Sequence, residues 1–191
     1  MTSFTIFGKG NMGDAIGGVL AAGGNDVAHI TEQTEVAQIT GEVVVLAVPY
    51  PAVAGIIEAY GDQFAGKVVV DITNPLNFET FDSLVVPVGS SAAAEIQAKL
   101  PNSKVLKAFN TTFAATLATK KVGDNQTTVL IAGDDAAAKA TLADAVIAGG
   151  VGAIDAGSLS RAHELEALGF LQLTLAAGEA IAWTGGFAVV R

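Results

Sequence analysis

The stretch Phe4-Thr5-Ile6-Phe7-Gly8-Lys9-Gly10-Asn11-Met12-Gly13 decides the fold, because an apolar strand pattern runs directly into a G-x-G-x-x-G turn. A helical pattern opens behind it at Asp14. In this context Gly8 permits the tight turn, Gly10 lets the backbone approach a pyrophosphate, and Gly13 lets helix and strand pack closely. The N–H groups of the first helical turn then face the anion. The stretch predicts a dinucleotide-binding turn; the alternative is a tight turn that carries three of the chain's 22 glycines.

Strand and helix patterns alternate along most of the chain. Strand patterns occupy 4–7, 27–30, 43–48, 68–72, 105–108, 127–132 and 151–155. Helical patterns occupy 11–22, 51–60, 91–99 and 135–149, and the connector 31–42 is long enough only for a helical turn or coil. Several strands are continuous β-branched runs, which is typical of strands buried on both faces. The alternation predicts an α/β fold with a Rossmann-type, doubly wound, mainly parallel sheet, formed by a dinucleotide-binding domain over 1–157.

The remaining residues, 158–191, form a C-terminal helical segment in this interpretation. Ser158-Leu159-Ser160 offers N-cap side chains, and one long helix is expected from Arg161 to about Trp183. One stripe of this helix comprises Leu165, Leu168, Gln172, Leu175, Ala176 and Glu179, while Phe170, Leu171, Leu173 and Ile181 lie off it. A helix that is apolar on most sides needs burial. Either a second subunit or the chain's own domain supplies it, and we expect a homodimer.

Composition excludes several classes of function. The chain has 10 basic and 19 acidic residues and a net charge of −9, which opposes binding to nucleic acid and to anionic membranes. It contains no cysteine, so disulfides and thiolate metal sites are excluded. No uninterrupted apolar run approaches the roughly 18 residues of a membrane span. We therefore expect a soluble, cytoplasmic protein that acts on a small molecule and binds no metal.

Polar loops follow three of the predicted strands. Ala47-Val48-Pro49-Tyr50, Asp71-Ile72-Thr73-Asn74-Pro75-Leu76 and Lys107-Ala108-Phe109-Asn110-Thr111-Thr112 each end a strand. The prolines stiffen these loops, so the backbone groups of Ala47, Val48 and Thr73 can present fixed donors and acceptors. Ligands of doubly wound folds bind at the carboxyl ends of the strands. Ordinary turn chemistry explains any one loop alone, but three of them beside the glycine turn predict a pocket.

Taken together, these motifs resemble one family over nearly the whole chain. The glycine turn, the three strand-end loops, Ala132-Gly133-Asp134-Asp135 and the stretch 155–166 appear in the order found in the NADP oxidoreductases that use coenzyme F-420. The resemblance implies that the nicotinamide lies near Pro49, Asn74 and the Asn110 loop. It also implies a second substrate, such as F-420 or a flavin, between that loop and the C-terminal helix. The cofactor-binding residues expected on both grounds are Gly8, Lys9, Gly10, Asn11, Met12, Gly13, Thr31, Glu32, Ala47, Val48, Pro49, Asn74 and Pro75.

Two departures from the family pattern concern the choice between NADP and NAD. The connector 31–42 is short, and the serine and arginine with which the family grips the 2′-phosphate align with Thr31 and Glu32. An acidic residue at this distance from the glycine turn is typical of NAD binding, and a carboxylate opposes a phosphate. Lys9 is the counterweight, because it can reach the 2′-phosphate from the glycine turn. The sequence slightly favours NAD over NADP, and a solvated loop carboxylate is the alternative for Glu32.

No residue stands out as a dedicated acid or base. Hydride transfer to a flavin-like ring needs proximity and orientation above all. Asn110, Thr111 and His163 are the catalytic candidates, although a histidine at a helix start serves packing more often than catalysis, and His29 lies near the sheet edge. Asp134 and Asp135 indicate a helix cap. The predicted function is an NAD(P)-dependent oxidoreductase; the alternatives are a non-catalytic dinucleotide sensor and a reductase of an imine or keto acid.

Overall fold

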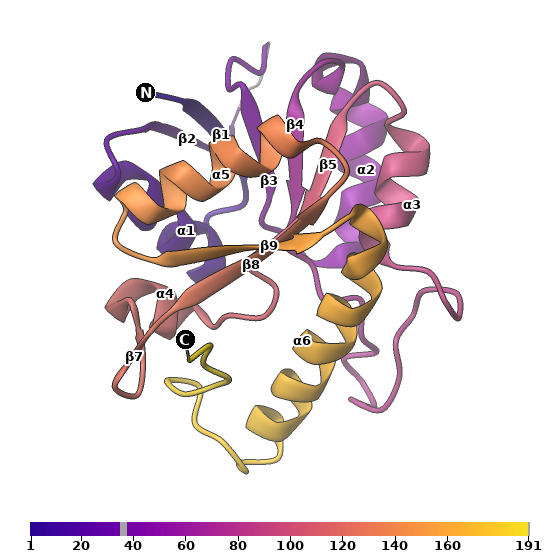
Figure 1. Cartoon of the computed structure of the whole chain (residues 1–191). Coiled ribbons are helices and arrows are strands. Elements are labelled where there is room, and N and C mark those ends of the chain that lie inside the picture. Colours follow the sequence, from indigo (N-terminus) through magenta and orange to yellow (C-terminus); the bar gives the residue numbers. More distant parts are fainter. Residues whose placement is uncertain (35–37, 191) are drawn as a thin grey trace.

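A seven-stranded sheet forms the centre of the protein, as a computed structural model of residues 1–34 and 38–190 shows (Figure 1). The strands run in the order β2-β1-β3-β4-β5-β8-β9, and only the pairing of β5 with β8 is antiparallel. The strands are β1 (Ser3–Phe7), β2 (Asp26–Ile30), β3 (Val43–Leu46), β4 (Val68–Asp71), β5 (Lys104–Lys107), β8 (Thr128–Gly133) and β9 (Gly152–Gly157). Because β2 and β3 lie on opposite sides of β1, the strand order reverses at β1. The predicted Rossmann-type α/β fold is confirmed.

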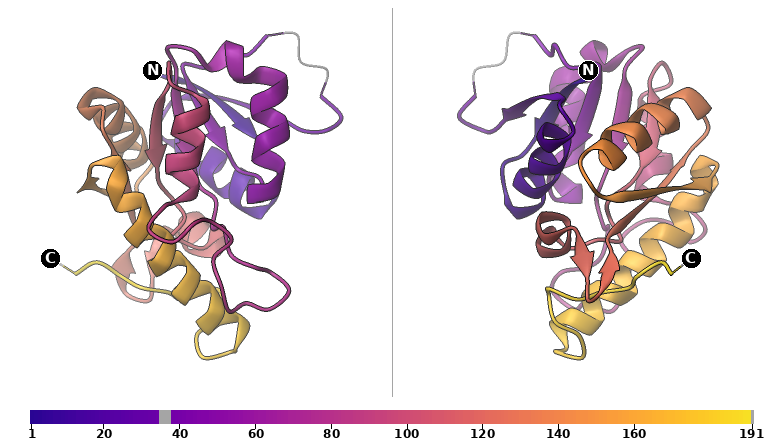
Figure 2. Two further views of the ribbon diagram at one scale, coloured as in Figure 1. Left: turned by 90° about the vertical axis from the view of Figure 1, so that its right-hand side faces the viewer. Right: turned by 60° about the vertical axis from the view of Figure 1, so that its left-hand side comes forward.

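Helices cover both faces of this sheet (Figure 2). Helices α1 and α5 lie on one face, and α2 and α3 lie on the other. The helices are α1 (Asn11–Ala22), α2 (Tyr50–Tyr60), α3 (Ala92–Lys99), α4 (Ala114–Thr119), α5 (Ala136–Ala148) and α6 (Ala162–Ala177), with 3-10 turns η1 (Gly61–Phe64) and η2 (Leu159–Arg161). No helix among the described residues is long and apolar enough to cross a membrane.

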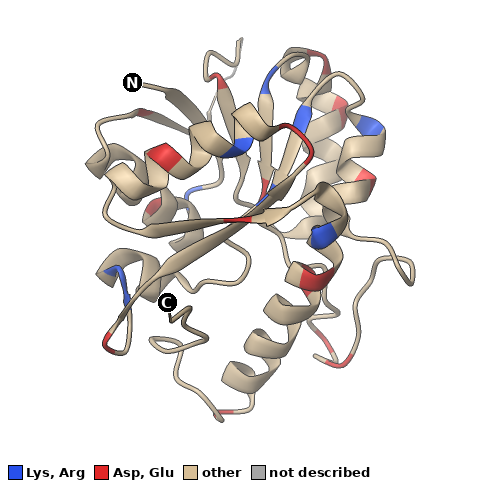
Figure 3. Ribbon diagram, in the orientation of Figure 1, with Lys and Arg blue, Asp and Glu red and all other residues tan. Residues whose placement is uncertain are grey.

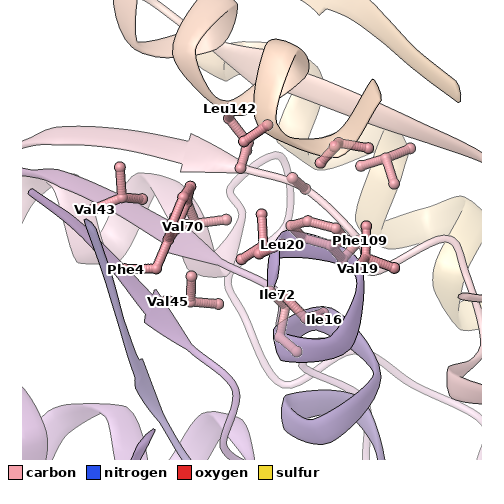
Figure 4. Packing of buried hydrophobic residues seen from close by; sticks show 14 of the residues in the cluster. Phe4, Ile16, Val19, Leu20, Val43, Val45, Val70, Ile72, Phe109 and Leu142 are labelled. Carbon is pink, nitrogen blue, oxygen red and sulfur yellow. The ribbon is translucent and has the colours of Figure 1, made fainter. Parts of the chain in front are cut away.

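Alternate residues of β3 show how the two apolar layers form. Val43 and Val45 join a cluster with Phe4, Ile16 and Leu20 beneath α1 and α5 (Figure 4). Val44 and Leu46 point the other way and join the second cluster, beneath α2 and α3. Successive side chains of a strand point to opposite faces, so a continuous apolar run is what a sheet covered on both sides requires. This arrangement fixes the carboxyl ends of β1, β3, β4 and β5 at one edge.

The C-terminal helix differs from its prediction at both ends. It ends at Ala177 instead of near Trp183, because Gly178 and the left-handed Glu179 (φ 60°) turn the chain, and the Ala180 N–H donates to Leu175 O (2.9 Å). At its start the η2 turn precedes the helix, and neither Ser158 nor Ser160 caps it; their hydroxyls lie 2.8 Å apart. The predicted stripe is confirmed at Leu165, Gln172 and Ala176, whereas Leu168 and Leu175 are only half-buried and Glu179 is exposed. The buried residues of α6 are Ala162, Leu165, Glu166, Gly169, Gln172 and Ala176.

Two small elements were absent from the sequence prediction. They are the six-residue helix α4 and the hairpin of β6 (Lys121–Val122) and β7 (Asn125–Gln126). Both are too short to show a periodic pattern. The coil predicted for the connector agrees with the structure over 31–34 and 38–42, and residues 35–37 lie outside the described part. The domain division at 157/158 stays a prediction.

Candidate functional site

The glycine turn has the backbone geometry that its spacing predicts. Gly8 has φ +103°, and a Cβ there would lie 2.3 Å from Ala47 O. A Cβ on Gly13 would lie 2.6 Å from Gly8 O, so only glycine lets α1 start so close to the turn. Around Gly10, by contrast, no described atom lies within 4 Å of the Cβ position. Two glycines are therefore needed for packing, and the third leaves open the approach to the N-terminus of α1, where an anion is favoured.

A first cavity of about 650 Å³ lies on one side of this turn. Gly8, Lys9, Thr31, Glu32 and Val48 line it, together with residues of α2. Lys9 and Glu32 are both exposed, so one basic and one acidic side chain face the same space. Thr31 is held by its neighbour, since the Thr34 hydroxyl accepts from the Thr31 N–H (2.9 Å).

A second cavity of about 370 Å³ lies on the other side of the turn. Its lining comes from segments far apart in the sequence, and includes Asn11, Met12, Asn74, Asn110, Thr112 and Trp183. Asn11 and Met12 open helix α1, so the glycine turn separates the two cavities. Eight of the thirteen predicted cofactor residues therefore border two adjoining spaces at the reversal of the strand order, where Rossmann folds bind ligands. The other five, which are in neither lining, are Gly10, Gly13, Ala47, Pro49 and Pro75.

Asn74 and Asn110 brace each other beside the second cavity. The Asn74 amide donates to Asn110 O (2.9 Å), and the Asn110 amide donates to Asn74 Oδ1 (3.0 Å) and to Leu165 O of α6 (2.8 Å). Gly169 makes this approach feasible, because a Cβ there would lie 2.3 Å from Asn74 Oδ1. The preceding Phe109 is fully buried with φ 65°, a conformation that few non-glycine residues adopt. Asn110 thus joins two strand-end loops to α6.

A buried charge cluster lies directly behind these loops, and the sequence analysis missed it. Lys107 Nζ lies 2.7 Å from Asp71 Oδ2 and 2.8 Å from Glu166 Oε1, and it donates to Thr73 O (2.6 Å). All three charged side chains are at most 1% exposed. Burial raises the pKa of the Glu166 carboxyl, while Lys107 opposes that shift. Asp71 and Lys107 pair in register across β4 and β5. The available signal was a charged residue at the carboxyl end of each of two apolar strands.

This cluster reaches the start of helix α3. Glu166 accepts from the Ala92 N–H (2.9 Å) and the Ala93 N–H at the first turn of α3. On the same side, the Tyr50 hydroxyl at the start of α2 donates to Glu95. Burial, followed by that hydrogen bond to Glu95, raises the pKa of Tyr50 above its usual range. The cluster therefore ties β4, β5, α3 and α6 together behind the second cavity.

Several backbone groups expected to serve a ligand are used by the protein itself. The Ala47 N–H donates to Phe7 O (2.9 Å), which extends the pairing of β1 with β3. The Thr73 N–H donates to Asp71 Oδ1 (2.8 Å), and Thr73 O accepts from Lys107. Pro75 is buried, and its carbonyl accepts from the Val85 N–H (2.7 Å). Pro49 is exposed at the N-cap of α2.

Of the three catalytic candidates, only one lines the second cavity. Asn110 lines the second cavity, whereas Thr111 and His163 are not in its lining, and Thr112 and Phe113 take the place expected for Thr111. The His163 ring bonds through Nδ1 to Ser90 O (3.1 Å), which tethers the loop before α3. His29 bonds to Gly8 O (3.0 Å) and so supports the glycine turn. Asp135 caps α5 as predicted, accepting from the Ala138 N–H (2.8 Å).

Comparison with known proteins agrees with this geometry. Residues 26–75 match the family described as NADP oxidoreductase, coenzyme F420-dependent. The F420-dependent NADP reductase of Methanocaldococcus jannaschii is 34% identical over 134 residues, which are 67% of this chain and 59% of that protein. Rat metalloreductase STEAP3 is 38% identical over 108 residues, which are 56% of this chain and 21% of that protein. The chain thus spans about three fifths of the Methanocaldococcus protein and about a fifth of the rat protein.

One solved structure covers the whole chain. The crystal structure of a candidate F420-dependent NADP-reductase from Arthrobacter sp. FB24 aligns with 100% of both chains at 26% identity and a TM-score of 0.85. Fold, glycine turn and adjoining cavities define a Rossmann-type α/β protein with a candidate ligand site at the carboxyl ends of its strands. The resemblance predicted from the sequence is confirmed: the chain is similar to the F420-dependent NADP oxidoreductases.

Proposed function

We propose that this protein is an NAD(P)-dependent oxidoreductase that moves a hydride between a nicotinamide dinucleotide and a small or ring-type acceptor. The open surface at Gly10, between two turn glycines that are closed by packing, carries the proposal. The pyrophosphate would lie at the start of α1. The adenosine half would lie in the first cavity, and the nicotinamide would lie in the second, near Asn11, Met12 and Asn74.

The reaction balances without a protein nucleophile. When bound, NAD(P)H would supply a hydride, which carries two electrons, and a proton from water would complete the reduction of the acceptor. The protein then has to hold the two rings in contact, exclude water and keep the loops rigid. The mutual hydrogen bonds of Asn74 and Asn110, and the buried cluster behind them, support that role. No titratable side chain occurs in the described lining of the second cavity.

The choice between NADP and NAD rests on Lys9 and Glu32. The relatives named as NADP reductases support NADP. Glu32 opposes the 2′-phosphate and Lys9 attracts it, and both line the first cavity. We propose that the protein accepts both cofactors and that Glu32 shifts the preference towards NAD. An F-420 or flavin-type acceptor is likewise proposed from the resemblance, as are a homodimer through α6 and a cytoplasmic location.

Replacing Gly10 with valine tests the proposed site. The space around Gly10 admits the side chain without a clash in the protein, so the variant should fold, while the valine methyl groups should exclude the pyrophosphate. We expect the dissociation constant for NADPH or NADH, followed by nicotinamide fluorescence, to rise at least about thirtyfold.

Gly18→Val is the matched control, because Gly18 is exposed on the same helix and its Cβ position is also open. This variant should bind as the parent does. A folded Gly10→Val protein with the parent's affinity would place the cofactor elsewhere. A parent that binds the dinucleotide but transfers no hydride to any flavin, quinone or imine would favour the sensor.

A further inference from the structure

The only tryptophan of the chain lies in the wall of the second cavity. Trp183 is 52% exposed, although it is the largest apolar side chain in that wall. Its ring packs against Phe113, with the ring centroids 5.1 Å apart and the planes tilted by 53°. Phe113 is itself buried and opens helix α4. Trp183 is therefore supported by the protein and still offers open aromatic surface beside Asn74 and Asn110.

The segment that carries Trp183 is fixed in place by a buried side chain of α6. We call residues 178–190 the C-terminal strap; in Figure 2 it turns back from the end of α6 and passes the β6–β7 hairpin. Gln172 is 2% exposed, and it joins the strap to the Asn110 loop: its Oε1 accepts from the Phe187 N–H (3.0 Å) and its Nε2 donates to Thr111 O (3.3 Å). Gly186 (φ 127°) passes against the same amide. The strap is thus positioned by a specific contact.

The second cavity favours an uncharged partner. Among the described residues of its lining there is no lysine, arginine, aspartate or glutamate. In Figure 3 the turns of α6 beyond Glu166 are likewise free of charged residues. A carboxylate or phosphate placed there would lose its hydration without gaining a counter-ion. Met12, Phe113, Leu173 and Trp183 instead present apolar and aromatic surface, which suits a flat ring.

We propose that Trp183 is a specificity-determining residue of the acceptor site, where it stacks on an uncharged, planar ring of the second substrate. This inference deepens the proposed function and rests on it, because the stacked ring would be the hydride acceptor. The polar amide groups of Asn74 and Asn110 border the same space and would meet the ring's edge. Small keto acids are disfavoured, because their carboxylate would lie inside the same neutral lining.

Riboflavin is a suitable probe, because it is an uncharged tricyclic ring whose own fluorescence is quenched when it stacks on indole. We would titrate it into the full chain with and without NADP⁺. Trp183→Ala should weaken riboflavin binding about tenfold. Trp183→Phe should keep the affinity within about threefold and lose most of the quenching. Phe187→Ala, on the same strap but outside the cavity lining, is the matched control and should behave as the parent does.

Turnover supplies an independent readout. With NADPH as donor, Trp183→Ala should raise KM for riboflavin about tenfold and leave KM for NADPH within about twofold. Parent-like affinity and quenching in Trp183→Ala would overturn the inference, as would a parent that binds neither riboflavin nor the uncharged quinone menadione. A parent that binds neither NADPH nor NADH would instead refute the proposed function. The riboflavin titration without NADP⁺ would still decide the role of Trp183.

Discussion

The two cavities beside the glycine turn place their charges differently. The first has Lys9 and Glu32 exposed in its wall. The second has a neutral wall, while Asp71, Lys107 and Glu166 lie buried just behind it. An exposed charge can discriminate between ligands at little cost to folding, whereas a buried one is costly unless it is paired. Under the proposed function, the charges of the first cavity would select between cofactors. The buried charges behind the second cavity instead hold β4, β5, α3 and α6 together.

The largest expected effect comes from breaking the buried cluster of Asp71, Lys107 and Glu166. Lys107→Met leaves the Asp71 and Glu166 carboxylates buried without their cation, which should cost about 3–5 kcal/mol of the free energy of unfolding. Glu166→Gln leaves the Lys107–Asp71 pair intact and should cost roughly 1 kcal/mol. Denaturant unfolding followed by circular dichroism measures both.

Lys104→Met is the control for Lys107→Met. Lys104 begins the same strand and pairs with Asp135 at 3.1 Å, but its side chain is 46% exposed, so its loss should cost at most about 1 kcal/mol. If Lys107→Met were as stable as Lys104→Met, the buried cluster would not stabilise the fold.

The sequence predicted the glycine turn far better than it predicted the second cavity. The glycine turn is local: strand, turn and helix are consecutive, and the conformations of Gly8 and Gly13 follow from spacing alone. The parallel sheet was equally legible, because runs such as 43–46 are apolar at every position. The second cavity is assembled from α1, two strand-end loops, α6 and the strap, so no window of sequence contains it.

The end of α6 shows a different limit. Leu175 to Trp183 continues a helical composition, and Gly178 alone did not identify the turn that brings Trp183 back over Phe113. Beyond that turn the strap is held by Gln172, which the helical pattern placed on a packing stripe without indicating its partners Thr111 and Phe187. Tertiary contacts therefore set the path of the strap, which helix propensity left open.

The second prediction concerns the junction of the strand-end loops with α6. Asn110→Ala removes donors to Asn74 Oδ1 and Leu165 O and should cost about 1–3 kcal/mol. Because the loop borders the acceptor space, we also expect kcat/KM for the acceptor to fall roughly tenfold, with NAD(P)H affinity changed only a few-fold. Asn125→Ala, at an exposed asparagine of β7, should leave both quantities unchanged. A stable Asn110→Ala protein with normal turnover would contradict this role.

The third prediction sharpens the role of charge in the first cavity. Glu32→Arg should tighten NADPH binding about tenfold by supplying a phosphate partner, with NADH affinity nearly unchanged. Lys9→Gln should act in the opposite direction on NADPH alone. Glu58→Arg makes the same change of net charge at an exposed site on α2 and controls for general attraction. A parent that clearly prefers NADPH would reject the NAD preference and assign the phosphate to Lys9.

The smallest effect should come from a charge outside both cavities. Asp135 accepts from the Ala138 N–H and pairs with Lys104, and these two contacts, the hydrogen bond foremost, lower the pKa of its carboxyl below the usual 3.8. The folded protein therefore holds this carboxylate ionised more readily than the unfolded chain does. Its stabilising contribution is complete above the unfolded pKa and is lost as pH falls through the folded one. Asparagine also caps helices, so Asp135→Asn should cost little at pH 7.

The variant's cap no longer titrates, so its Tm should fall less steeply than the parent's between pH 5 and pH 3, by about 2 °C. Asp124→Asn, in the exposed hairpin turn, removes a carboxylate that caps no helix and should keep the parent's slope. Scanning calorimetry across this range compares the three proteins. Parallel curves for Asp135→Asn and the parent would show that the cap contributes no pH dependence. Cofactor affinity at pH 7 should be the same in all three, because Asp135 lines neither cavity.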